Sequence, residues 1–371
     1  MKIIYVTPVY RPHIGGMEVV AEKIAQSSAG QGYVTEVLTS GSKLTGYGES
    51  TVSDNFHVKR FVTVPRIKPA IMPGLLADLC KQSRDTIVHL HVAQAVTPEM
   101  VFLASHIKKF PYIAHFHLDV PPSHTFGKVL LPLYKKYVLR KVLQRAKKII
   151  VPTIDYKQLV SEKYAIADEK IEIIPNGTDH QISTKPKESV RRGKKVRLLY
   201  VGRLTAQKNI RLMLEALSEY EKSYSGLAEL VIIGDGPEIP AITRIVKQLK
   251  LERSVKLKGS LYERELESEF EKADVFLLTS SHESFGIVLV EAMAKGLPII
   301  AVNIHGVRNV VHNMRNGILV KPVPRDTAEA LNKLVTDTQL FATISKYNLT
   351  DAQAYSWENI FSKLAEVYRC L

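Results

Sequence analysis

The sequence predicts an α/β protein with two doubly wound parallel sheets, one in each half of the chain. The chain has 371 residues, which is long for one hydrophobic core, so two domains are expected. Short β-branched runs alternate with amphipathic helical patterns in both halves, which indicates parallel sheets with helices on both faces. Residues 181–195 interrupt this alternation, since they have no apolar periodicity, and they indicate a linker.

The first half supplies the expected N-terminal domain, residues 1–180. Its strands are predicted at residues 2–7, 33–40, 86–92, 111–117, 147–153 and 170–177. Helical periodicity predicts helices at 17–30, 97–109 and 128–148.

The second half repeats the pattern over residues 181–354. We expect strands at 196–204, 228–236, 254–260, 273–281 and 297–302, and helices at 209–222, 238–251 and about 285–295. A last amphipathic helix follows at 357–371. Two such Rossmann-like domains facing one another would form a cleft, and ligands bind in such clefts at the carboxyl ends of the strands. The loops after the strands are therefore where we expect the chemistry.

Composition predicts a cytoplasmic protein. The apolar fraction of 45% and the charged fraction of 24% are those of a soluble globular chain. The two cysteines, Cys80 and Cys370, lie far apart, which excludes a disulfide framework and suits a reducing compartment. The N-terminal stretch lacks the pattern of a signal peptide, and no stretch approaches the roughly 20 apolar residues of a membrane span.

The net charge of +14 is concentrated in part at residues 128–148, which contain eight Lys or Arg and no acidic residue. Leucine, valine and tyrosine alternate with these charges at helical spacing. A basic amphipathic helix of this kind is typical of attachment to an anionic membrane surface. The alternative is a surface helix that packs its apolar face on its own domain.

Two glycines, Gly15 and Gly16, follow the first strand at a helix entrance. The missing Cβ lets backbone N–H groups approach an anionic ligand at the positive end of the helix dipole. No GxGxxG pattern is present here, which argues against a nicotinamide or flavin enzyme. A flexible turn remains the alternative.

Four histidines lie on two strands, as His89 and His91 and as His115 and His117. Residues two apart on a strand share a face, so each pair could bind a metal. A metal site usually needs a third ligand and ordered partners around the ligands, and the sequence guarantees neither, so we expect no metal. His117 ends its strand and is better placed than His115 to meet a substrate.

Arg203 follows a strand of the second half, and Lys208 lies near the next helix start. An arginine and a lysine at a helix N-terminus form a site for a diphosphate, although an exposed, unliganded pair is the alternative. Gly234, in the following strand-end loop, again permits a close backbone approach.

The segment "SHESFGIVLVEAMAKG", residues 281–296, has a carboxylate at each end of an apolar helix. Glu283 precedes the helix, and Glu291 lies within it, where a buried carboxylate needs hydrogen-bond donors. Lys295 is the simple donor, and the ribose of a nucleotide is the other. The N–H groups at the helix start, at Phe285, Gly286 and Ile287 after Ser284, would bind the phosphates.

These motifs resemble those of the retaining GT-B glycosyltransferases of the family four type, the "glycosyl transferases group 1" domain. "HESFGIVLVEAMAKGLPIIA" is similar to the E-x7-E signature of that family, and "GRLTAQKN" to its phosphate motif, a Gly-Arg pair followed by a lysine. "IIPNGTD" is similar to its P-N-G-V-D segment, with Thr178 in place of the usual valine, and "GGME" to its N-terminal glycine loop. The resemblance covers nearly the whole chain.

The resemblance implies a role for each of these residues. Arg203 and Lys208 would stabilise the leaving diphosphate, Glu283 the transferred sugar, and Glu291 the ribose, with His117 at a sugar hydroxyl. Ser284, Phe285, Gly286, Ile287, Gly234 and Gly16 would complete the donor site, and Gly15, Gly16 and His117 would bind the acceptor. The last helix, residues 355–371, would cross back onto the N-terminal domain.

The predicted function is therefore retaining transfer of a sugar from a nucleoside diphosphate sugar, by default a UDP-sugar, to a hydroxyl of a glycan, glycolipid or lipid-linked acceptor. No Asp-x-Asp pair occurs in the chain, so no metal and no cofactor are expected at the diphosphate. A nucleotide-sugar epimerase on the same fold is one alternative. A non-enzymatic basic protein that binds nucleic acid is the other, although the aromatic residues such binders use do not cluster among the charges.

Overall fold

The computed structural model describes residues 1–13, 15–42, 45–63, 71–93, 95–119, 125–190, 195–224 and 227–371, without the side chains of 125–129. The chain forms two compact units. One comprises Met1–Asn176 and Trp357–Leu371, and the other comprises Gly177–Ser356. Residues 191–194 of the expected linker lie outside the described residues.

An eight-stranded sheet forms the centre of the N-terminal unit, in the order β3-β4-β2-β1-β5-β6-β7-β8. All neighbouring strands are parallel except β3 and β4. The strands are β1 Lys2–Val6, β2 Val34–Ser40, β3 Gly48–Ser53, β4 Phe56–Phe61, β5 Ile87–Val92, β6 Tyr112–Phe116, β7 Lys148–Val151 and β8 Ile171–Ile173. The sequence pattern did not predict β3 and β4.

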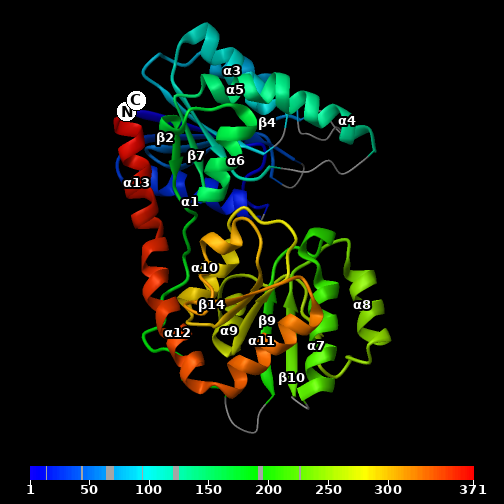
Figure 1. Cartoon of the computed structure of the whole chain (residues 1–371). Coiled ribbons are helices and arrows are strands. Elements are labelled where there is room, and N and C mark those ends of the chain that lie inside the picture. The colour runs from blue at the N-terminus through cyan, green and yellow to red at the C-terminus, as the bar shows by residue number, and fades with distance from the viewer. Residues whose placement is uncertain are drawn as a thin grey trace. The chain divides into compact units, whose positions relative to one another are not determined.

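Helices cover this sheet (Figure 1). They are α1 Gly16–Gly30, α2 Pro73–Leu79, α3 Thr97–Lys108, α4 Thr125–Tyr134, α5 Arg140–Arg145, α6 Ile154–Tyr164 and α13 Trp357–Arg369. The last helix, α13, packs on α1 within this unit.

The basic segment differs from the single helix predicted at 128–148. It consists of α4, a π-helical turn over Lys135–Leu139, and α5, which ends at Arg145. Lys148 already belongs to β7, whose remaining residues are buried. The lysines at the end of the basic run therefore lead into the sheet and are not part of a helix face.

The C-terminal unit has a six-stranded parallel sheet in the order β11-β10-β9-β12-β13-β14. Its strands are β9 Val196–Val201, β10 Ala228–Ile233, β11 Val255–Leu257, β12 Val275–Leu278, β13 Ile299–Val302 and β14 Gly317–Val320. Numbered within the unit, this order is 3-2-1-4-5-6, that of the Rossmann fold. The predicted fold class, two Rossmann-like units, is confirmed.

Six α-helices of the C-terminal unit are described: α7 Ile210–Tyr224, α8 Ile239–Gln248, α9 Glu263–Lys272, α10 Ile287–Ala294, α11 Pro324–Thr336 and α12 Thr338–Ala352. Buried residues of β9, β12 and α10 belong to one hydrophobic core, which holds the strand ends in place. No helix in the described part of the chain is long and apolar enough to cross a membrane.

Candidate active site

The chain order reverses between β9 and β12, which are neighbours in the sheet although their first residues are far apart in sequence. In open α/β sheets this switch point is where ligands bind, outside the carboxyl ends of the strands. Hydrogen bonds join the two loops that leave these strands. The Thr279 hydroxyl donates to the Asn209 carbonyl at 3.0 Å, and the Ser281 N–H donates to the Gln207 carbonyl at 2.8 Å.

This junction brings Lys208 and Glu283 together. The Lys208 ammonium donates to the Glu283 carboxylate, which also accepts from the Ser280 hydroxyl at 3.0 Å. Both side chains are mostly buried, at 22% and 12% exposure. The cation expected at the diphosphate thus neutralises the anion expected at the sugar.

Arg203 is exposed at the same edge of the sheet. Its guanidinium has no hydrogen-bond or ion-pair partner among the described residues, whereas its carbonyl accepts from the Tyr200 hydroxyl at 3.4 Å. The guanidinium of Arg203, a second cation near Lys208, is therefore available to an anionic ligand.

Glycines let the neighbouring loops approach one another. Gly234 has φ +137°, and a Cβ there would lie 2.0 Å from the Gly202 carbonyl oxygen. Gly306, at φ +83°, would place a Cβ 2.5 Å from the Glu283 carbonyl oxygen. The close approach at Gly234 is therefore to the loop that carries Arg203. The sequence analysis did not select Gly306. It lies in a loop shortly after β13, as Gly234 lies after β10, and this position after a strand could have indicated it.

The segment before α10 is anchored by one aromatic side chain. Phe285 is buried and packs edge-on against Tyr355 at 5.8 Å between ring centroids. Gly286 follows with φ +80° and caps the helix, which begins at Ile287. The side chain of Phe285 therefore belongs to the core. The first N–H groups of α10 lack partners within the helix, as at every helix start.

Glu291 lies within α10 with its side chain 20% exposed. Burial, with a smaller contribution from the negative charge of Asp179, raises the pKa of Glu291 to about 7. The Nε2 atom of His180 is 3.9 Å from the carboxylate. Burial and then the charge of Lys295 lower the pKa of His180, so this histidine is neutral at pH 7 and offers no cation.

Lys295 does not pair with Glu291, so the pairing considered from the sequence is wrong. Its buried ammonium donates to Glu267 at 2.5 Å and lies 3.8 Å from Glu271, both on α9. Tertiary packing thus overrides the i,i+4 pairing on the helix. The sequence analysis also missed Asp179, whose charge acts on Glu291, and His180, which lies near its carboxylate. Asp179 is the last residue of the "IIPNGTD" segment, and His180 follows it.

The N-terminal unit carries the remaining predicted residues. Gly15 is the N-cap of α1 in an extended conformation, and Gly16 is the first residue of that helix. His117 follows β6, and its Nε2 lies 2.7 Å from Nδ1 of His91. Burial lowers the pKa of His117 to about 3, so the ring is neutral at physiological pH. Residues 120–124, which follow this strand end, lie outside the described residues.

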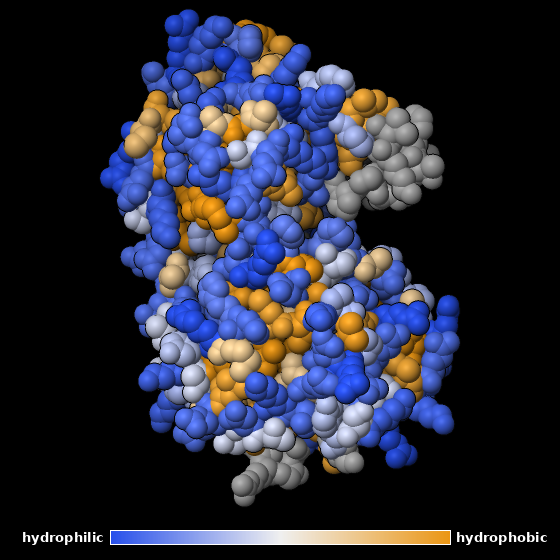
Figure 2. All heavy atoms as spheres, viewed as in Figure 1, coloured by the Kyte–Doolittle hydropathy of each residue, from blue (hydrophilic) through white to orange (hydrophobic). Residues whose placement is uncertain are grey.

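The basic segment exposes apolar side chains. Leu130, Leu133, Tyr137 and Val138 are between 39% and 56% exposed, and Leu103 of α3 is 46% exposed. Apolar residues gather over α4 on the face shown in Figure 2. A groove of about 410 Å³ beside them is lined by Met100, Leu103, Tyr134 and Val138, among others.

One lysine of this segment faces inward. Lys135 is buried and lies 2.7 Å from Asp119, which also pairs with Lys163. Among the described side chains from Leu130 to Arg145, the exposed lysines are Lys136 and Lys141.

Comparisons with known proteins identify the family and the fold. The model for "Glycosyltransferase Family 4" matches residues 14–182, and the model for "Glycosyl transferases group 1" matches residues 181–350. An uncharacterised glycosyltransferase of Methanocaldococcus jannaschii is 26% identical over 100% of this chain and 98% of its own. The sulfoquinovosyl transferase of Arabidopsis thaliana is 24% identical over 86% of this chain and 63% of its own. The Anabaena protein HepE, solved with UDP-glucose, has the same fold, with a TM-score of 0.78 at 20% identity over all of both chains.

The raised pKa of Glu291 makes folding stability depend on pH. Its pKa is about 7 in the folded chain against an ordinary value of 4.5, so ionising it costs stability as pH rises between those values. Glu291→Gln removes this cost. We expect the variant to gain stability relative to the natural chain from pH 5 to pH 8, by on the order of 3 kcal/mol. Denaturant unfolding at several pH values measures this difference.

Glu252→Gln, at an exposed position of the same unit, is the control and should show no such trend. A difference for Glu291→Gln that stays constant from pH 5 to pH 8 would contradict the electrostatic account of this carboxylate.

Proposed function

Because this chain belongs to the family four glycosyltransferases, enzymes of the GT-B fold, we propose that it transfers a sugar from a UDP-sugar to an acceptor hydroxyl with retention of configuration. The observation that carries the donor assignment is the cluster at the β9–β12 switch point. Two cations, a helix N-terminus and two carboxylates lie on adjoining loops and on α10. The family resemblance drawn from the sequence motifs is confirmed by the family matches.

The donor would be held along this cluster. Arg203 and Lys208 bind the diphosphate, Glu283 holds hydroxyls of the transferred sugar, and Glu291 accepts from the ribose hydroxyls. Glu291 is suited to this role because it is mostly buried and has no cationic partner among the described residues, so two hydroxyl donors would stabilise its ionised form. UDP is the preferred nucleotide because HepE, a protein of the same fold, was solved with UDP-glucose.

Transfer would proceed on the face of the leaving group. The acceptor oxygen bonds to the anomeric carbon while the bond from that carbon to the phosphate oxygen breaks, and a phosphate oxygen takes the acceptor proton. Arg203, Lys208 and the N–H groups at the start of α10 stabilise the charge that develops on the diphosphate. With two side-chain cations available, we propose that this step needs no metal ion. His117 in the N-terminal unit is proposed to bind a sugar hydroxyl through its neutral ring.

The family match weakens the two alternative functions, a nucleotide-sugar epimerase and a non-enzymatic protein that binds nucleic acid. Membership of a glycosyltransferase family, with named glycosyltransferases among the relatives, supports transfer over epimerisation. The same membership makes a purely binding, non-enzymatic role for the basic charge unnecessary.

The acceptor is proposed to be lipid-linked, and the enzyme to work at the cytoplasmic face of a membrane. Exposed leucines and a tyrosine on α4 and the π-helical turn adjoin Lys136, Arg140 and Lys141. This combination suits insertion of apolar side chains among anionic headgroups. The inward pairing of Lys135 with Asp119 removes that lysine from the membrane-facing set.

Substitutions at Glu291 and at Glu283 should affect different steps, the first donor binding and the second turnover. A panel of nucleoside diphosphate sugars tested by thermal shift first identifies the donor, and UDP-sugars are expected to stabilise the chain most. Glu291→Ala should then weaken donor binding about tenfold or more, since it removes hydrogen bonds to a charged acceptor. Glu283→Gln should leave the Kd for UDP nearly unchanged and lower kcat by roughly a hundredfold.

Calorimetry and a transfer assay separate these effects, with Glu252→Gln as the control. The donor assignment fails if no nucleotide sugar stabilises the protein. The residue assignments fail if both variants keep normal binding and turnover.

The membrane proposal is tested by sedimentation with phosphatidylcholine vesicles that contain phosphatidylglycerol. Replacing Lys136, Arg140 and Lys141 together by serine should weaken binding by about a hundredfold, at about 1 kcal/mol for each cation. The matched control replaces the exposed Arg244, Lys247 and Arg253 of the other unit and changes net charge equally. If the two triple variants bind vesicles equally, the basic segment is an ordinary surface segment and the membrane proposal is wrong.

A further inference from the structure

A cluster of histidines is buried inside the N-terminal unit. His89 and His91 lie on β5, and His115 lies on the neighbouring strand β6. The register pairs His91 with His115, and it pairs His89 with Tyr5 of β1 on the other side. Alternation along the strands places these side chains on one face of the sheet, so residues from three strands meet there.

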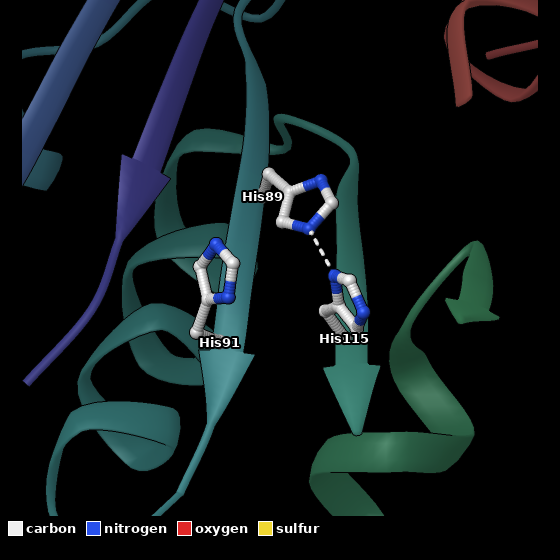
Figure 3. A group of neighbouring side chains, drawn as sticks. All are labelled: His89, His91 and His115. Carbon is white, nitrogen blue, oxygen red and sulfur yellow. Dashed lines mark hydrogen bonds between the residues drawn. The ribbon is translucent and has the colours of Figure 1, made fainter. Parts of the chain in front are cut away.

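The three histidines converge at distances suited to shared binding (Figure 3). One ring nitrogen from each lies within 4.8 Å of one from each of the others. The Nε2 of His89 and the Nδ1 of His115 are already 3.1 Å apart. Nitrogens bound to a zinc ion at about 2.0–2.1 Å in tetrahedral geometry are about 3.4 Å from one another. Side-chain rotations that close each gap between nitrogens by at most roughly 1.4 Å would therefore complete the site.

The three rings lie inside the N-terminal unit. His89, His91 and His115 are between 0% and 3% exposed. Side chains this deeply buried would enclose a bound ion within the core.

Hydrogen bonds within the protein leave this cluster incompletely satisfied. Nε2 of His91 and Nε2 of His115 are buried and have no partner among the described residues. An unsatisfied buried polar atom costs about 1–3 kcal/mol. Two such atoms in one cluster favour a role for these rings beyond filling the core.

A hydrogen bond orients the ring of His89 through the nitrogen that does not face the other two histidines. The Tyr368 hydroxyl on α13 lies 2.7 Å from Nδ1 of His89, and the Tyr5 hydroxyl lies 3.1 Å from that of Tyr368. Metal-binding histidines usually have such a partner on the nitrogen that does not face the metal. The third ligand and the ordered partner that the sequence could not guarantee are therefore both present.

We propose that His89, His91 and His115 bind a divalent transition-metal ion of the zinc class inside the N-terminal unit. The ion would tie β5 to β6 and, through His89 and Tyr368, to the C-terminal helix α13. Its role is structural and is independent of the donor residues 203–291. His117, whose Nε2 faces His91 at 2.7 Å, lies directly beside the site.

Elemental analysis tests the proposal on the full chain, purified without a histidine tag from cells grown with added zinc and then dialysed. We expect about one zinc ion per chain. His89→Gln and His115→Gln should each lower the zinc content at least tenfold. His106→Gln, at an exposed position on α3, is the control and should keep the metal.

The metal dependence of the melting temperature gives a second measurement on the unchanged chain, which does not rely on variants that fold. Dialysis against a chelator should lower the Tm by several degrees, and zinc chloride should restore it. A natural chain that contains no metal and whose Tm does not respond to chelator or zinc would overturn the proposal. Either result is independent of whether a nucleotide sugar binds.

Discussion

The parallel pairing of β9 with β12 is the contact on which the rest of the donor site depends. Strand order reverses there, so the loops that leave the two strands lie side by side at one edge of the sheet. Hydrogen bonds from Thr279 and Ser281 to the opposite loop then fix their relative position. This junction brings Lys208 against Glu283. It also places the start of α10 beside them. The hydrophobic core beneath it supplies the rigidity that precise placement of charged groups requires.

The charges of the site indicate what a ligand must supply. Lys208 and Glu283 neutralise each other, so a nucleotide sugar has to exchange this pair for its own phosphate and hydroxyl groups. Glu291 is different because its raised pKa reflects burial near a second acid without a compensating cation. Lys295, the residue that follows α10, is held by Glu267 of α9 instead. The site is therefore neutral on the sugar side and short of hydrogen-bond donors on the ribose side.

Local sequence patterns predicted the elements that place the site, because strand and helix periodicity is strong where an element is buried. The start of α10 after Gly286 follows from such a pattern. By contrast, β3 was missed because all six of its residues are exposed and carry no alternation. The partners of Lys135 and Lys295, and the meeting of His91 with His115, depend on packing between elements distant in sequence. No local pattern contains that information.

The central claim is that Glu291 accepts hydrogen bonds from the ribose of the donor. Calorimetric titration with UDP-glucose at pH 7, in two buffers of different ionisation heat, measures the protons exchanged on binding. Hydroxyl donors would lower a pKa that is about 7 in the free chain, so roughly half a proton should be released for each donor bound. Glu291→Gln should abolish this release. Binding without proton release in the natural chain, or equal release in the variant, would contradict the account.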